Sequence, residues 1–327
     1  MIHATHISRR YGNFTAVDDV SFTINSGEIV GLLGHNGAGK TTIMKMLTGF
    51  LEPSTGEIVI DGKSLEDNAN SIQQLIGYLP ENLPVYPEMT VMDHLFYCAR
   101  MRNIPTAEID TRVTDAIAKT QLEEKALQPI ATLSRGYKQR VGVAQALIHN
   151  PKILILDEPT NGLDPHQTQQ MRHLIRSLAK QATVIVSTHI MQEVDALCDR
   201  VLILDGGQLA VDQTMEELRR CEHIALETSA SLETVNAFLA EFYVEEKSQA
   251  SAPATALTTD NGVTGYQLPV TDKLDPRALC AWMTGKLVDA GEKVFDIHPI
   301  LRDLETVFRN IHLQKQQPSA QEARNVA

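Results

Sequence analysis

The stretch GLLGHNGAGKTT, Gly31 to Thr42, joins an apolar run to a glycine-rich turn that ends in a lysine and two threonines. The apolar run predicts a buried parallel strand, whereas Ile43, Met46 and Leu47 recur after the turn at helical spacing. We therefore expect a strand, a tight loop and a helix that ends near Gly49.

The turn matches the pattern Gly-x-x-x-x-Gly-Lys-Thr from Gly34 to Thr41. Glycines allow successive backbone N–H groups to point inward at the positive end of the helix dipole, which makes a cradle for an anion. In such a loop Lys40 would reach the β and γ phosphates of a triphosphate, and the Thr41 hydroxyl would ligate Mg²⁺. The alternative, a chance glycine turn, arises about once in a hundred chains of this length. The sequence therefore predicts triphosphate binding.

A second strand, in PKILILDEPTNGLDP, ends in two acids. The continuous apolar run 153–156 is typical of a central parallel strand covered on both faces, and Asp157 and Glu158 follow at its carboxyl end, where ligands of open α/β sheets bind. There Asp157 could hold Mg²⁺ and Glu158 could orient or deprotonate an attacking water. The alternative is a pair of solvated acids capping a strand, which the P-loop earlier in the chain argues against.

Composition limits the other classes of function. A chain of 327 residues with 43% apolar residues can form more than one domain. Its net charge of −12 argues against a nucleic-acid partner, because counterion release needs a strongly basic face. The four cysteines lie too far apart in the sequence for a zinc or disulfide pattern. We find no signal peptide and no apolar window of about 20 residues, so another chain would have to cross any membrane involved.

Residues 133–149, LSRGYKQRVGVAQALIH, predict a second anion-binding helix terminus. Ser134 and Gly136 lie at a helix start with free backbone N–H groups, and the apolar residues that follow keep the helical period. Together with Tyr11, the P-loop, LILDEP and His189 of VIVSTH, this order of motifs resembles the nucleotide-binding subunit of an ATP-binding cassette (ABC) transporter. The resemblance covers residues 1 to about 220.

The resemblance implies a P-loop α/β cassette with an antiparallel β portion and a helical subdomain at about 84–150. Tyr11 would stack on adenine, Glu158 would be the catalytic base, and His189 would be the switch histidine near the γ-phosphate. Thr41 and Asp157 would hold the magnesium ion, with Lys40 on the phosphates. The residues that match the phosphate loop are Gly34, Asn36, Gly37, Ala38, Gly39, Lys40, Thr41 and Thr42.

The resemblance also implies a dimer. Ser134 and Gly136 would contact ATP held by the P-loop of a second subunit, and Asp164 matches the acid of the interface loop. Two subunits would then enclose two nucleotides. Both half-sites are intact in this sequence, so a homodimer is the simpler expectation.

Two motifs depart from the common family pattern. LSRGY replaces LSGGQ at 133–137, and Glu81 of YLPEN replaces a glutamine, although its carboxylate could still reach Mg²⁺ or water. This combination resembles one branch of bacterial exporter ATPases, which includes those associated with gliding motility, copper-site maturation of nitrous oxide reductase, and export of small drugs or antibiotics. The region 81–92 would face the permease.

A different unit is predicted at 221–313. It alternates strands and helices as a small α+β domain, interrupted by a polar insertion without periodicity at about 246–265. Such a domain could serve packing or dimerisation, or it could hold a regulatory ligand. The polar tail 314–327 is predicted to be disordered.

We therefore expect the energy-coupling subunit of a membrane exporter, which hydrolyses ATP with Mg²⁺ on the cytoplasmic face of the inner membrane. Its partners would be an integral-membrane permease subunit and a second ATP-binding subunit. One alternative is a cytosolic cassette ATPase that remodels an assembly without a membrane channel. Another is a nucleotide-dependent scaffold with little turnover. The sequence does not specify the cargo.

Overall fold

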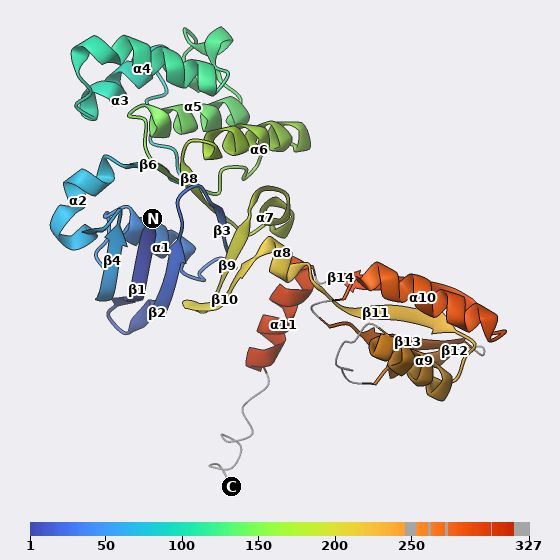
Figure 1. The fold of residues 1–327 in the computed structure, drawn as a ribbon. Helices are drawn as coiled ribbons and strands as arrows, with labels where there is room; N and C mark the ends of the chain where they lie inside the picture. The colour runs from blue at the N-terminus through green and yellow to red at the C-terminus, as the bar shows by residue number, and fades with distance from the viewer. Residues whose placement is uncertain (246–252, 261–262, 272–273, 302, 317–327) are drawn as a thin grey trace. The chain divides into compact units, whose positions relative to one another are not determined.

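The computed structural model describes residues 1–245, 253–260, 263–271, 274–301 and 303–316. The chain divides into one unit of Met1–Met215 with Ile311–Ala327, and a second unit of Glu216–Asn310 (Figure 1). In the described part of the chain, no helix has both the length and the apolar character needed to cross a membrane.

The first unit contains a six-stranded sheet in the order β10-β9-β3-β8-β7-β6. All neighbouring strands in it run parallel except β10, which is antiparallel to β9. Every residue of β3, β7 and β8 is buried, and most of these residues are apolar, as expected for parallel strands covered on both faces. The strands are β3 (Ile29–Leu33), β6 (Ile76–Leu79), β7 (Ile153–Asp157), β8 (Thr183–Thr188), β9 (Arg200–Asp205) and β10 (Gln208–Thr214).

The order of these strands positions the site. Because β8 pairs with β3 on one side and β7 on the other, Thr188 lies beside Leu33, and Ser187 lies beside Asp157. The carboxyl ends of the three strands therefore bring together the glycine-rich loop, the two acids and the segment that carries His189.

A second, antiparallel sheet in the order β2-β1-β4-β5 supplies the expected antiparallel portion. It shares one core with α1 and α2 and with residues of the parallel sheet. The elements are β1 (Ile2–Tyr11), β2 (Phe14–Ile24), α1 (Lys40–Leu47), β4 (Thr55–Ile60), β5 (Lys63–Ser64) and α2 (Leu65–Gln73).

Three helices form a layer with its own apolar core, within the range expected for the helical subdomain (Figure 1). They are α3 (Val91–Met101), α4 (Thr106–Lys119) and α5 (Arg135–Leu147), and the short 3₁₀ helices η1 (Glu123–Lys125) and η2 (Ile130–Thr132) connect the last two. Thr90 caps α3 by accepting a hydrogen bond from the Asp93 N–H at 3.1 Å. The helices α6 (Pro165–Ala179) and α7 (Met191–Leu197) also belong to this unit, and α8 (Met215–Leu218) spans the boundary between the two units in the sequence.

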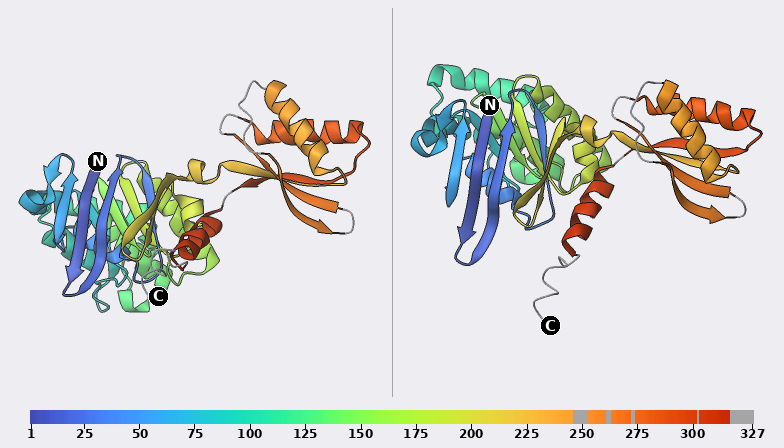
Figure 2. Two further views of the ribbon diagram at one scale, coloured as in Figure 1. Left: turned by 90° about the horizontal axis from the view of Figure 1, so that it is seen from below. Right: turned by 60° about the horizontal axis from the view of Figure 1, so that its bottom comes forward.

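The second unit has the order β-α-β-β-α-β. Its strands form an antiparallel sheet in the order β12-β13-β11-β14, which is the ferredoxin-like arrangement. Figure 2 shows both helices on one face of this sheet, where they cover an apolar core. The elements are β11 (Cys221–Thr228), α9 (Leu232–Glu245), β12 (Thr255–Asp260), β13 (Val263–Pro269), α10 (Pro276–Asp289) and β14 (Val294–Leu301).

The prediction of a polar insertion without periodicity at about 246–265 is wrong for part of that range. β12 lies inside it and pairs with β13, which also begins there. An edge strand needs one paired side only, so a polar, threonine-rich segment can form it without an alternating apolar pattern. Residues 246–252 and 261–262 lie outside the described residues.

The prediction of a disordered tail at 314–327 is wrong for its first residues, because α11 (Leu304–Gln316) continues to Gln316. The remainder of that prediction, residues 317–327, lies outside the described residues.

Candidate functional site

The loop between β3 and α1 has the backbone of an anion cradle. Gly37 and Gly39 have φ of +86° and +102°, values that residues with side chains rarely adopt. A Cβ on Gly34 would lie 2.7 Å from the Leu204 carbonyl oxygen, and one on Gly39 would lie 2.7 Å from the Ala16 carbonyl oxygen. The close backbone approach therefore requires glycine at both positions.

Lys40 places its ammonium group within this loop. Its Nζ donates to the carbonyl oxygens of Gly34 at 2.7 Å and His35 at 3.2 Å, and only 7% of the residue is exposed. Burial lowers the pKa of Lys40, and the negative charges of Glu158, Asp157 and Glu81 oppose that shift in decreasing order. The three carboxylates that the sequence assigned to the site therefore act on the same ammonium group.

Asp157 and Thr41 form an oxygen pair beside the loop. The Thr41 hydroxyl donates to Asp157 Oδ2 at 3.3 Å, and the Ser187 hydroxyl donates to Asp157 Oδ1. Mg²⁺ prefers oxygen ligands and is commonly held by one or two carboxylates together with phosphate oxygens, so these residues fit the ion. In the described residues no group of three or more His, Cys, Asp or Glu could hold a metal. Phosphate oxygens would have to complete the coordination.

Glu81 lies at the margin of this group. It is exposed, and its charge acts on Lys40 and on Tyr78, whose pKa burial raises to about 12 with smaller contributions from Asp157 and Glu81. The contact of Glu81 with Mg²⁺ or water stays a prediction.

Glu158 and His189 are in direct contact. His189 Nδ1 lies 2.9 Å from Glu158 Oε1 and 3.0 Å from Oε2, and Glu158 is 8% exposed. Glu158 also has a φ of +50°, which is unusual for a residue with a side chain and costs on the order of 1–3 kcal/mol. Such a conformation persists only when its surroundings fix it, and its N–H donates to the Ser187 carbonyl oxygen at 3.1 Å.

Ser134, Gly136 and Asp164 form a second group at the starts of α5 and α6. Ser134 is the exposed N-cap residue of α5, and a Cβ on Gly136 would lie 2.7 Å from Gln167 Oε1. Asp164 caps α6 by accepting from the Gln167 N–H at 2.8 Å. Asp164 thus has a structural role besides the interface role that the sequence suggested.

Tyr11 lies at the end of β1 with 47% of its surface exposed. The Arg9 guanidinium carbon lies 4.9 Å from the centre of its ring, and Arg9 Nη1 donates to the Glu52 carbonyl oxygen at 2.8 Å. A cation thus lies over the ring of Tyr11, whose expected stacking on adenine stays a prediction.

Sequence reasoning missed several residues that position this site. Ser187 binds Asp157, and Gln139 donates to the Glu158 carbonyl oxygen at 3.4 Å. The polar run that ends the strand of VIVSTH was the available signal for Ser187. No local pattern marks Gln139, because its role depends on how α5 packs against the loop after β7.

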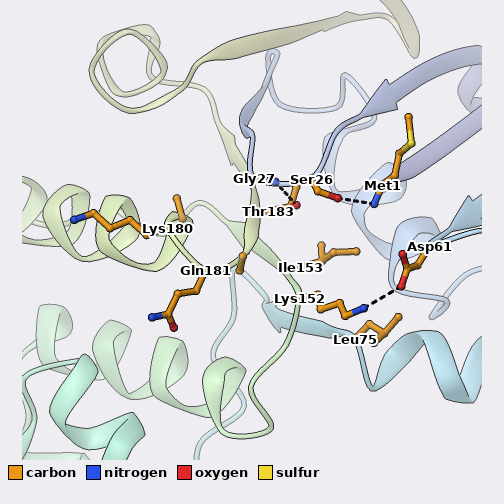
Figure 3. A pocket seen from close by; sticks show the side chains of 12 residues that line it. Met1, Ser26, Gly27, Asp61, Leu75, Lys152, Ile153, Lys180, Gln181 and Thr183 are labelled. Carbon is orange, nitrogen blue, oxygen red and sulfur yellow. Dashed lines mark hydrogen bonds and ion pairs between the residues drawn. The ribbon is translucent and has the colours of Figure 1, made fainter.

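A cavity of about 380 Å³ lies at the opposite, amino-terminal ends of β3, β7 and β8 (Figure 3). Lys152 donates to Asp61 at 3.1 Å at its edge, and the Gly27 N–H donates to Thr183 at 2.9 Å. Ligands of parallel sheets bind at the carboxyl ends of the strands, so this cavity does not belong to the site.

The fold and these contacts define a P-loop nucleotide-hydrolysing domain. A family model described as ABC transporter matches residues 17–161. The chain is 38% identical over 228 residues to the ABC transporter ATP-binding protein NatA of Bacillus subtilis (strain 168), an alignment that covers 68% of this chain and 93% of that protein. The chain therefore belongs to the ABC transporter ATP-binding proteins and has their ATP-hydrolysing cassette, as predicted.

Two further similarities bear on function. The Nod factor export ATP-binding protein I of Sinorhizobium fredii (strain NBRC 101917 / NGR234) is 39% identical over 212 residues, which cover 64% of this chain and 62% of that protein. The dimeric structure of MJ0796, a bacterial ABC transporter cassette, is similar with a TM-score of 0.60 and 25% identity, and covers 66% of this chain and 99% of that chain.

Proposed function

We propose that this chain is the energy-coupling subunit of a membrane exporter, which works as a homodimer and hydrolyses ATP with Mg²⁺ through Glu158 and His189. The observation that carries the proposal is the contact of His189 with the buried Glu158 carboxylate beside Lys40. A general base needs to be held in place close to the phosphates, and the contact of Glu158 with His189 near Lys40 supports that role.

The residues divide the work of phosphoryl transfer. The loop N–H groups and Lys40 bind the phosphates, Glu158 accepts the proton of the attacking water, and His189 orients Glu158 and faces the γ-phosphate. Asp157 and Thr41 would hold Mg²⁺, which neutralises charge on the phosphate oxygens when bound. Little covalent chemistry is required of the protein, because positioning and charge stabilisation supply most of the rate.

Dimerisation follows from the second group. Ser134 and Asp164 are exposed at the starts of α5 and α6, with Gly136 buried behind them, and this group would contact ATP bound by a second copy. ATP would bind the closed dimer better than the open subunits, so its γ-phosphate is the ligand that favours closure. Hydrolysis removes this ligand, and the dimer opens.

The permease partner is supported by the name of the Nod factor export relative and by an exposed aromatic side chain. Phe50 is 70% exposed after α1, and its ring centre lies 6.0 Å from that of Tyr78 on β6. We include this aromatic pair with the predicted region 81–92 in the permease-facing surface. A soluble subunit bound there would lie at the cytoplasmic face of the inner membrane. The second unit would be an accessory domain of the same subunit.

Hydrolysis is tested by the variant Glu158→Gln, which keeps the size of the side chain. We expect phosphate release to fall by about 10²–10⁴-fold, while ATP binding is retained. Equal turnover by the two proteins would rule out Glu158 as the base. Negligible turnover by the wild type in the presence of its partners would favour the nucleotide-dependent scaffold.

Docking is tested by recovering the tagged chain from native membranes in mild detergent and identifying co-purified membrane proteins. Phe50→Asp should reduce recovery of a multi-span partner without lowering ATP hydrolysis by the isolated subunit. Phe14→Asp is the matched control, since Phe14 is 63% exposed on the antiparallel sheet. Recovery of soluble partners alone would favour the cytosolic remodelling ATPase.

A further inference from the structure

A buried carboxylate lies behind the Glu158–His189 pair. Glu193, on α7, is 4% exposed, and its Oε2 atom accepts hydrogen bonds from the hydroxyls of Thr160 and, at 3.2 Å, Thr188. These threonines are 4% and 1% exposed. A carboxylate inside a protein is costly unless it is hydrogen-bonded, so the two hydroxyls account for its burial.

The two hydroxyls come from the two segments that carry the hydrolytic pair. Thr160 is two positions after Glu158, and Thr188 directly precedes His189. The Thr188 hydroxyl also accepts from the Ile190 N–H at 3.0 Å, so residues on both sides of His189 are fixed to one another. One carboxylate oxygen of Glu193 therefore connects the segment after Glu158 to the turn that holds His189.

The backbone at Glu158 explains why such a connection matters. Its φ of +50° needs support from neighbouring contacts. The Ser187 carbonyl oxygen fixes the N–H of Glu158 itself, and the bond from Thr160 to Glu193 fixes the chain just after it. Without that bond the segment could relax, and the carboxylate of Glu158 would move relative to His189.

We propose that Glu193 is a positioning residue for ATP hydrolysis, which holds Glu158 and His189 in register by binding Thr160 and Thr188. This inference rests on the proposed roles of Glu158 and His189. It assigns Glu193 no contact with the nucleotide, so it predicts an effect on turnover and none on binding. A carboxylate that served packing alone would change thermal stability and leave the turnover of folded protein intact.

The test uses Thr160→Val, which keeps the shape of the side chain and removes the hydroxyl, beside Thr160→Ser, which retains it. We expect kcat of the full-length ATPase to fall on the order of tenfold in Thr160→Val, the effect of one lost charge-assisted hydrogen bond, with KM for ATP unchanged. Thr160→Ser should restore kcat. Thr120→Val is the matched control, because Thr120 is fully buried in the helical layer and donates to the Ala116 carbonyl oxygen.

A second variant tests the carboxylate itself. Glu193→Gln should lower kcat in the wild-type background and cause no further loss in His189→Ala, because a positioning residue acts through its target. Unchanged kcat in both Thr160→Val and Glu193→Gln, or independent effects of Glu193→Gln and His189→Ala, would overturn the inference. Glu158→Gln separates the two proposals. If Glu158→Gln retains wild-type turnover, the proposed function fails. If Glu158→Gln loses turnover while Thr160→Val and Glu193→Gln do not, only the role of Glu193 is refuted.

Discussion

His149 should make the first unit sensitive to acid. Its Nε2 atom is 3.0 Å from the Ile76 carbonyl oxygen, which joins the end of α5 to the start of β6. Burial lowers the pKa of His149 to about 4 from an ordinary value of 6.5, and the positive charges of Arg102 and Arg112 add to the shift. The folded protein therefore keeps this imidazole neutral at pH values where the unfolded chain protonates it.

The magnitude follows from these two values. Between pH 6.5 and pH 4 the unfolded state binds more protons, so the free energy of unfolding decreases as the pH falls. The complete difference amounts to about 3.4 kcal/mol, of which about 2 kcal/mol is lost between pH 7 and pH 5. Below pH 4 both states are protonated and this contribution does not change further.

The variant His149→Gln removes the titrating group while its amide can still donate to the Ile76 carbonyl oxygen. Urea unfolding of the nucleotide-free protein at pH 7 and pH 5 should show about 2 kcal/mol less acid destabilisation in this variant than in the wild type. His173→Gln, at an exposed position on α6, should behave as the wild type. An NMR titration that places the pKa of His149 near 6.5 in the folded protein would refute the reasoning. Equal acid sensitivity of the wild type and His149→Gln would also refute it.

Three other outcomes are expected. Gly77→Ala should lower the melting temperature by several degrees or more, because the new Cβ would lie 2.2 Å from the Ala146 carbonyl oxygen. An unchanged melting temperature would contradict the packing of α5 on β6. Since burial lowers the pKa of Lys40, ATP affinity of the wild type should weaken as pH rises towards 10.5, whereas Lys40→Arg should show no such decline in calorimetric titrations. Arg9→Gln should weaken ATP binding by about three- to tenfold through loss of the cation over Tyr11, and the effect should vanish in a Tyr11→Ala background.

Much of the nucleotide site could be predicted because its residues occur in continuous segments. The glycines, Lys40 and Thr41 follow one strand, and Asp157 and Glu158 follow another, so local spacing was sufficient to predict their chemistry. The resemblance carried by these motifs implied the α/β cassette and its helical layer, and the structure confirms both. The second unit was expected as α+β, but β12 was missed because an edge strand of polar residues lacks an apolar period.

By itself, then, the sequence determined which side chains follow which strands, since backbone conformation and hydrophobic period are local properties. Tertiary structure alone decided which strand ends meet. Insertion of β8 between β3 and β7 brings His189 to Glu158 across 31 positions of the chain, and packing of α7 behind them places Glu193 against Thr160 across 33. No local pattern encodes these contacts, because they arise only when the apolar faces of separate elements are buried together.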